Sequence, residues 1–145
     1  MKLLVINGPN LDFLGIREPN IYGKGTYSDL KKYIKDIASD KKIKIKIMQS
    51  NYEGDIIEAI HKAYHQLLDG IIINPGAFTH YSYAIYDALK GVAIPCVEVH
   101  LSDIMNREEF RKTSVIRDAC ITSIYGKHFE SYKEAIEYLI GAYNV

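Results

Sequence analysis

A glutamate and a histidine stand two positions apart at the end of an apolar run, as Glu98 and His100. Residues at i and i+2 of a β-strand point to the same face, so these two side chains are expected to meet. A carboxylate next to an imidazole orients the ring and favours its charged form, which is what a general acid needs. A histidine held in the sheet by hydrogen bonds, with Glu98 as its structural partner, would show the same spacing. Just beyond the pair, the backbone N–H groups of Leu101 and Ser102 begin a turn that would suit a carboxylate or a phosphate.

A long loop after the first apolar run carries an arginine and a tyrosine, Arg17 and Tyr22. The loop covers residues 7–25, and loops of this length in compact domains are usually functional or disordered. Tyrosine is a weak base at neutral pH because its reference pKa is about 10, but a nearby guanidinium favours the phenolate. Arg17 could supply this charge; a surface tyrosine beside a solvated arginine is the alternative that the loop alone leaves open. We expect residues 14–25 to be mobile without a ligand, with glycines as hinges.

Polar side chains also follow the first and the third apolar runs. Asn10 comes after the first run, while Asn74 and His80 come after the third and could form hydrogen bonds with hydroxyl groups of a ligand. His80 could equally cap a helix or lie on the surface, and Arg111, on a short predicted helix, could be a surface charge. No lysine follows these runs, so no nucleophile for a Schiff base is evident.

The remaining motifs predict no metal or cofactor site. His61 and His65 have the i, i+4 spacing of some zinc sites, but no third ligand is near, and Lys62 and Gln66 indicate an exposed helix face. The glycines within residues 23–25 form neither a dinucleotide nor a phosphate-binding pattern. We therefore expect neither a metal ion nor an organic cofactor.

The elements that would position these residues alternate as strand and helix along the chain. We expect strands at residues 2–6, 43–48, 70–73, 95–100 and 119–123. We expect helices at residues 53–68, 81–90, 106–112 and 131–142, with a first helix that starts near Thr26 as its N-cap. Gly91 is expected to end the third helix. This succession predicts a single flavodoxin-like α/β domain, residues 1–145, whose parallel sheet has helices on both faces.

The strand pattern also predicts the order of the strands and the place of the site. Residues 43–48 alternate isoleucine with lysine, as an edge strand does, which fits the strand order 2-1-3-4-5. The carboxyl ends of parallel strands meet at one rim, where open α/β sheets bind their ligands. The polar groups that follow the first, third and fourth strands are therefore expected to line one small-molecule site.

Composition and charge exclude several classes of protein. The 145 residues are 48% hydrophobic and 25% charged, as in an ordinary soluble globular protein. Eighteen basic residues balance eighteen acidic ones, so there is no basic excess for nucleic acid or an anionic membrane. No stretch reaches the roughly 20 apolar residues of a transmembrane helix, and Met1 leads directly into a strand rather than a signal peptide. Cys96 and Cys120 are expected to be buried, reduced thiols, which predicts a cytoplasmic protein.

Several of these segments together resemble the type II 3-dehydroquinate dehydratases, over essentially the whole chain. The motifs that carry the resemblance are Asn7-Gly8-Pro9-Asn10-Leu11, Arg17-Glu18 followed by Tyr22-Gly23, Asn74-Pro75-Gly76-Ala77 with Thr79-His80, Val97-Glu98-Val99-His100-Leu101-Ser102, and Arg107-Glu108-Glu109-Phe110-Arg111. The resemblance implies that the protein dehydrates 3-dehydroquinate to 3-dehydroshikimate, in the shikimate pathway, by anti elimination through an enolate and without a cofactor. It also implies a homododecamer, built as a tetramer of trimers.

The resemblance further implies a role for each candidate residue. Tyr22 would remove the proton next to the ketone, and Arg17 would hold the phenolate form. His100 would protonate the leaving hydroxyl, oriented by Glu98 and Asn10, and Asn10 would also help to stabilise the enolate oxygen. The other implied roles concern substrate binding: Asn74, His80 and Arg111 at the ring hydroxyls, the N–H groups of Leu101 and Ser102 at the carboxylate, and Asp87 in the active site of a neighbouring subunit.

A few positions depart from the pattern of this family: Asp12, Phe13, Asp103, Met105, Asn106 and the segment 113–123. None of them is a catalytic position, but Asp12 adds a negative charge near the site of an anionic substrate, which we expect to weaken binding. A non-catalytic flavodoxin-like module for a flavin is the alternative, and it would need a phosphate loop rich in serine and threonine, which residues 7–14 lack. A purely structural role has no positive support, because each catalytic position is occupied.

Overall fold

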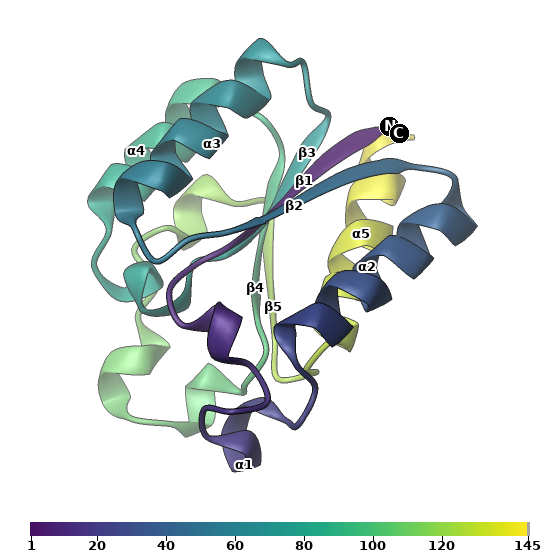
Figure 1. Cartoon of the computed structure of the whole chain (residues 1–145). Coiled ribbons are helices and arrows are strands. Elements are labelled where there is room, and N and C mark those ends of the chain that lie inside the picture. Colours follow the sequence, from purple (N-terminus) through teal and green to yellow (C-terminus); the bar gives the residue numbers. More distant parts are fainter. Residues whose placement is uncertain (145) are drawn as a thin grey trace.

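A computed structural model of the chain, which describes residues 1–144, shows a sheet of five parallel strands. The strand order is β2–β1–β3–β4–β5, as the sequence predicts (Figure 1). The strands are β1 (Lys2–Asn7), β2 (Lys44–Gln49), β3 (Gly70–Asn74), β4 (Cys96–His100) and β5 (Thr122–Tyr125). The inner strands β3 and β4 are buried along their whole length, whereas β2 exposes Lys44 and Lys46, as predicted for an edge strand.

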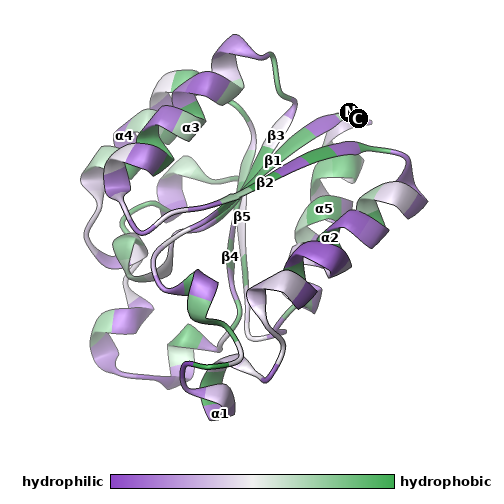
Figure 2. Ribbon diagram, viewed as in Figure 1, coloured by the Kyte–Doolittle hydropathy of each residue, from purple (hydrophilic) through white to green (hydrophobic). Residues whose placement is uncertain are grey.

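Helices cover both faces of the sheet (Figure 1). α2 (Tyr27–Lys41) and α5 (Glu130–Tyr143) lie on one face, and α3 (Glu53–His65) and α4 (Tyr83–Val92) lie on the other. Their apolar sides face the sheet and their polar sides face outward (Figure 2). Neighbouring residues of β1 alternate between the two resulting cores: Val5 packs under α2 and α5, and Ile6 packs under α3 and α4. Within residues 1–144, no helix is both long enough and apolar enough to cross a membrane.

The chain between β1 and α2 folds into two short helices rather than an open loop. They are the 3-10 helix η1 (Leu11–Phe13) and the α-helix α1 (Pro19–Tyr22). Thr26 then begins α2, as predicted, through a capping box in which the Asp29 N–H donates to the Thr26 hydroxyl at 3.1 Å. In return, the Thr26 N–H donates to the Asp29 carboxylate at 3.0 Å, so two otherwise unpaired donors at the start of the helix are satisfied.

Several helix boundaries differ from the sequence prediction. α3 ends at His65 rather than at residue 68, and α4 begins at Tyr83 rather than at residue 81. Gly91 does not end α4: the helix continues to Val92, and Ala93 takes the left-handed conformation (φ 54°) instead. The N–H of Ala93 donates to the Leu89 carbonyl, which is the last hydrogen bond of the helix, so Ala93 and not Gly91 is the C-cap. The helix predicted at residues 106–112 is split into two 3-10 helices, η3 (Ile104–Asn106) and η4 (Glu109–Lys112).

The last strand begins three residues later than the predicted start at residue 119. Residues before it form the 3-10 helix η5 (Arg117–Ala119), and the first hydrogen bond to β4 is Ile121 N–H to the Cys96 carbonyl, at 2.8 Å. Since β4 itself begins at Cys96, β5 has no partner before this point. Both thiols are free; Cys96 is buried as predicted, but Cys120 is only partly buried.

Candidate active site

The carboxyl ends of β1, β3 and β4 surround a cavity of about 80 Å³. The strands end level with one another, because Asn7 pairs with Asn74 and Ile73 pairs with Glu98. The cavity wall includes nine of the eleven residues predicted for the site: Asn10, Arg17, Tyr22, Asn74, His80, His100, Leu101, Ser102 and Arg111. Glu98 lies directly behind His100, so only Asp87 is remote from the cavity in this chain.

The turn after β1 is held in place by backbone contacts and by two amide side chains of the β2 end. The Gly8 N–H donates to the Asn74 carbonyl at 2.7 Å, and a Cβ at Gly8 would lie only 2.6 Å from the Pro75 carbonyl oxygen. Asn10 adopts a left-handed conformation (φ 69°), and its N–H donates to the Asn51 side-chain oxygen at 3.0 Å. Gln49 in turn donates to the same oxygen at 3.1 Å. These contacts set the backbone position of Asn10; the described side-chain contacts do not include one between Asn10 and His100.

The glutamate–histidine pair forms as predicted, and both side chains are buried. His100 Nε2 lies 2.5 Å from Glu98 Oε2, with relative exposures of 5% and 0% for the two residues. Two hydroxyl groups also donate to this carboxylate: Thr79 at 2.8 Å and Ser114 at 2.9 Å. Burial raises the pKa of Glu98, but the hydrogen bonds from His100, Thr79 and Ser114 outweigh it and hold that pKa below its ordinary value. An ionised carboxylate only accepts, so Nε2 carries a hydrogen and Nδ1 is the nitrogen left for the cavity.

Tyr22 lies beside two arginines, one of which the sequence analysis did not assign a role. Arg107 Nη1 donates to the Tyr22 hydroxyl at 2.8 Å and lies 3.2 Å from the Ser102 hydroxyl. Arg17 does not contact the hydroxyl; its guanidinium carbon lies 4.7 Å from the centre of the Tyr22 ring. The sequence analysis named only Arg17 as the guanidinium near Tyr22, and Arg107 is the one that contacts the phenolic oxygen. Two guanidinium groups therefore lie beside this side chain, one at its oxygen and one at its ring.

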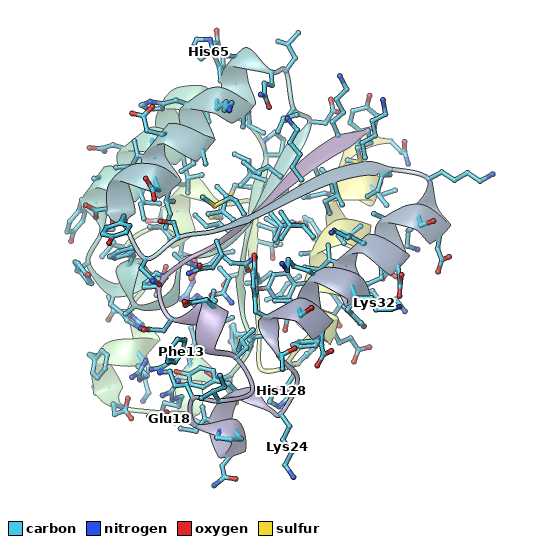
Figure 3. All side chains as sticks on the ribbon, viewed as in Figure 1. Phe13, Glu18, Lys24, Lys32, His65 and His128 are labelled. Atoms are coloured by element: carbon cyan, nitrogen blue, oxygen red, sulfur yellow. The ribbon has the colours of Figure 1, made fainter. Side chains whose placement is uncertain are left out.

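Residues 11–25, which carry Arg17 and Tyr22, form one wall of the cavity. We call this segment the cover. Glu18 begins α1 in a left-handed conformation (φ 42°), and its carboxylate lies 3.9 Å from Arg107 Nη2. Figure 3 shows Glu18 and Phe13 on this cover, next to the short helices that follow β4. Gly15 and Gly23 have φ values of 82° and 89°, which favour glycine. That these glycines act as hinges stays a prediction.

Three predicted binding residues have polar atoms that already contact the protein. His80 Nδ1 donates to the Thr113 carbonyl at 2.7 Å, and burial lowers the pKa of His80, so its Nε2 is available as an acceptor. Arg111 pairs with Glu108. Asn74 donates through Nδ2 to the Tyr132 hydroxyl at 2.9 Å, and its side-chain oxygen accepts from the Gly76 N–H at 3.3 Å. One N–H of the Asn74 amide is left for a ligand.

Tyr132 is a second residue that the sequence analysis missed. Its hydroxyl donates to the Asn7 side-chain oxygen at 2.7 Å, so it joins β1 and β3 to α5 below the cavity. The side chain is fully buried, and burial raises its pKa strongly. A buried tyrosine needs a partner for its hydroxyl. That rule, applied to a tyrosine on the apolar side of the last helix, could have identified it.

The turn after β4 offers free backbone donors. The N–H groups of Leu101 and Ser102 line the cavity and donate to no atom within residues 1–144. Two neighbouring donors of this kind form a site for a carboxylate. That these N–H groups bind the carboxylate of a ligand stays a prediction.

Asp87 lies on the exposed side of α4, away from the cavity. It borders a separate surface hollow of about 350 Å³ together with His61 and His65. Figure 3 places His65 at the opposite end of the molecule from Glu18. The role that the resemblance implies for Asp87, in the site of a neighbouring subunit, stays a prediction. A larger hollow, of about 650 Å³, is lined mainly by lysine and apolar side chains of β2, α2 and α3 and contains no acid–base pair.

The comparisons with known proteins agree with this geometry. The family model described as "Dehydroquinase class II" matches residues 1–140. A 3-dehydroquinate dehydratase from Clostridium acetobutylicum is 59% identical over 91% of each chain, and one from Fusobacterium nucleatum is 54% identical over 99% of each. The crystal structure of the type II dehydroquinase from Butyrivibrio crossotus superposes with a TM-score of 0.96 at 52% identity, covering 97% of both chains.

Fold, cavity and motifs thus lead to the same conclusion. The family model spans the motifs that line the cavity. The solved relative has the same fold, as its TM-score of 0.96 shows. The chain belongs to the class II dehydroquinase family.

Proposed function

We propose that this protein is a type II 3-dehydroquinate dehydratase, a hydro-lyase that converts 3-dehydroquinate to 3-dehydroshikimate in the shikimate pathway. Its relatives at 52–60% identity carry the same enzyme name. The observation that carries the proposal is that one cavity holds both a tyrosine between two guanidinium groups and a histidine paired with a buried carboxylate. A base and an acid of this kind are what the loss of water next to a ketone requires.

Tyr22 is the base in this proposal. Its phenolate takes the proton from the carbon next to the ketone, and the electron pair moves onto the ketone oxygen as an enolate. Arg107 and Arg17 stabilise the phenolate before this step, one at the hydroxyl oxygen and one over the ring. The side-chain amide of Asn10, which lines the cavity, helps to stabilise the charge that develops on the oxygen.

His100 is the acid. Its Nε2–H is held by Glu98, so a proton on Nδ1 can pass to the hydroxyl that leaves as water. Tyr22 comes from the cover and His100 from the end of β4, which suits a base and an acid that act on different faces of the ring. The carboxylate of the substrate lies on the N–H groups of Leu101 and Ser102, and its ring hydroxyls meet Asn74, His80 and Arg111.

We further propose a cytoplasmic homododecamer, a tetramer of trimers, in which Asp87 completes the site of a neighbouring subunit. Two features support this assignment. Asp87 is exposed and α4 carries Tyr83 at its surface with 67% exposure, as side chains that meet another subunit would be. The free thiols of Cys96 and Cys120 suit a reducing compartment.

A direct assay tests the proposed reaction. The purified protein is given 3-dehydroquinate, and the ultraviolet absorbance of the conjugated enone product is followed with and without borohydride. We expect turnover in both samples, because an enolate route forms no imine that borohydride could reduce. Turnover that disappears with borohydride would indicate a Schiff base and overturn the mechanism, and absence of turnover would overturn the function.

A further inference from the structure

The carboxylate of Glu98 receives more hydrogen bonds than its pairing with His100 requires. Thr79 and Ser114 each donate to it, one to Oε2 at 2.8 Å and one to Oε1 at 2.9 Å. Neither hydroxyl lines the cavity, and Thr79 is completely buried. Both residues therefore act on the reaction only through Glu98.

The hydrogen-bond partners of Glu98 favour its ionised form. Thr79, Ser114 and His100 Nε2 all lie within hydrogen-bond distance of its two oxygens. The two hydroxyls also lie 2.8 Å from each other, so they form one connected cluster with the carboxylate. Burial alone would raise the pKa of Glu98, but the hydrogen bonds from these partners lower it.

We propose that Thr79 and Ser114 are positioning residues for the acid step, which keep Glu98 ionised and so orient His100. The proposal rests on the proposed function, in which His100 is the acid. It adds two residues from outside the cavity to the residues on which the reaction depends.

The same short segment also holds a residue of the binding site. Residues 113–115 run beside the end of η2 (Gly76–His80), and the Val115 N–H donates to the Thr79 carbonyl at 2.7 Å. The Thr113 carbonyl accepts from His80 Nδ1, also at 2.7 Å. Thr79 and Ser114 therefore lie on two segments that hydrogen bonds join, and these bonds fix the distances from the two hydroxyls to Glu98.

The titratable groups around Glu98 are few. His100 and Cys96 are on its own strand, and His80 approaches from η2 with Arg111 behind it. On the side of β5, the register partner of Glu98 is Ser123, which does not titrate. If removal of a hydroxyl shifts the pH at which activity falls on the acid side, that shift therefore reports on the Glu98–His100 pair as a unit.

The test compares Ser114→Ala and Thr79→Val with two controls. We expect each variant to lower kcat about tenfold, with KM changed less than about twofold, because the acid step and not binding is weakened. The low-pH limb of kcat should move to higher pH, since a carboxylate with fewer donors is protonated more easily. Thr79→Ser keeps the hydroxyl and should restore the rate. Ser123→Ala is the matched control, because this buried hydroxyl next to Glu98 makes no hydrogen bond within residues 1–144.

A second readout does not depend on activity. The folded pKa of Glu98 lies below its unfolded value, so its stabilisation is complete above the unfolded pKa and is lost as pH falls through the folded one. Ser114→Ala should raise the folded pKa, so that its destabilisation in urea unfolding is larger at pH 7 than near pH 4. A loss that is equal at both pH values, or a kcat profile that moves no more than that of Ser123→Ala, would overturn the proposal.

The two proposals can fail separately. If the unaltered protein does not convert 3-dehydroquinate, the function fails, and urea unfolding still tests the effect of the hydroxyls on Glu98. If the unaltered protein is active and the variants behave like Ser123→Ala, the function stands and the positioning role is wrong.

Discussion

Tyr22 has two arginine neighbours whose positions differ. Arg107 meets the hydroxyl oxygen directly, while Arg17 lies over the ring, and the two guanidinium carbons are 5.1 Å and 4.7 Å from the ring centre. A hydrogen bond to the oxygen stabilises the phenolate where its charge is concentrated, whereas a cation over the ring acts on the more diffuse charge. The two arginines are therefore expected to contribute unequally.

Replacing Tyr22 by phenylalanine tests the base. The ring and its packing stay, but the atom that takes the proton is lost, so we expect kcat to fall by about 10²–10⁴-fold, the usual contribution of general base catalysis. Substrate binding, measured by calorimetry, should stay within a few-fold of the unaltered protein, and circular dichroism should show an unchanged fold. Retained turnover would refute the assignment of Tyr22.

Replacing Arg107 by methionine tests the arginine to which the sequence analysis assigned no role. The variant keeps most of the side-chain volume but loses the donor to the Tyr22 hydroxyl, and we expect kcat to fall by about 10²–10³-fold. Arg17→Met is the matched variant for the cation over the ring, and it should cost less than Arg107→Met in the same steady-state assay. The reverse order would show that the ring contact matters more than the hydrogen bond.

Prediction from the sequence was most successful where the signal is local, and Arg107 shows its limit. Glu98 and His100 are two residues apart on one strand, so strand geometry alone brings them together. Arg107 and Tyr22 are 85 positions apart, and their contact depends on how two irregular segments fold over the same cavity. No periodicity describes those segments, so neither motif spacing nor secondary structure could predict the contact.

At the scale of elements, the ends of strands and helices decide how well the site could be foreseen. Apolar runs predicted β1, β3 and β4, and therefore the rim on which the site is built. The start of β5 was misplaced because residues 119–121 are as apolar as a strand, but β4 begins only at Cys96 and offers residues 119 and 120 no partner. A strand boundary depends on the neighbouring strand, which the local sequence does not contain.

The cover over the cavity leads to a prediction for the segment of α1. Arg17 and Lys24 both lie in it, so trypsin can cut there when the segment lifts from the cavity. We expect limited digestion to cleave after these residues, and a saturating substrate analogue to slow this cleavage about tenfold or more, because a bound ligand favours the closed form. Mass spectrometry of the fragments identifies the cut. Equal cleavage rates with and without the analogue would show that the segment does not close over a ligand.

At the scale of the whole molecule, two buried connections link the site to both faces of the sheet. Tyr132 of α5 contacts Asn7 and Asn74 on one side, and Thr79 with Ser114 reaches Glu98 on the other. The site is thus supported by α5 on one side and by η2 and the chain after η4 on the other, and the position of its side chains depends on the assembled fold.

Mixing two variants tests whether subunits share their sites. Asp87→Ala and Tyr22→Phe are each expected to be nearly inactive. If Asp87 acts in a neighbouring subunit, mixed assemblies contain sites with both original residues, about a quarter of all sites in a random equal mixture. We therefore expect activity to appear after the two variants are unfolded and refolded together. Full activity of Asp87→Ala alone, or a mixture no more active than its components, would contradict a shared site.

The position of Tyr22 on the cover has a kinetic consequence. Arg17 and Tyr22 line the cavity from this segment, so a bound ligand lies between the cover and the ends of the strands. If the cover closes over the substrate and opens for the product, each catalytic cycle includes two displacements of the chain through solvent. Added sucrose, which makes the solvent more viscous, should then slow turnover even though it leaves the chemistry untouched.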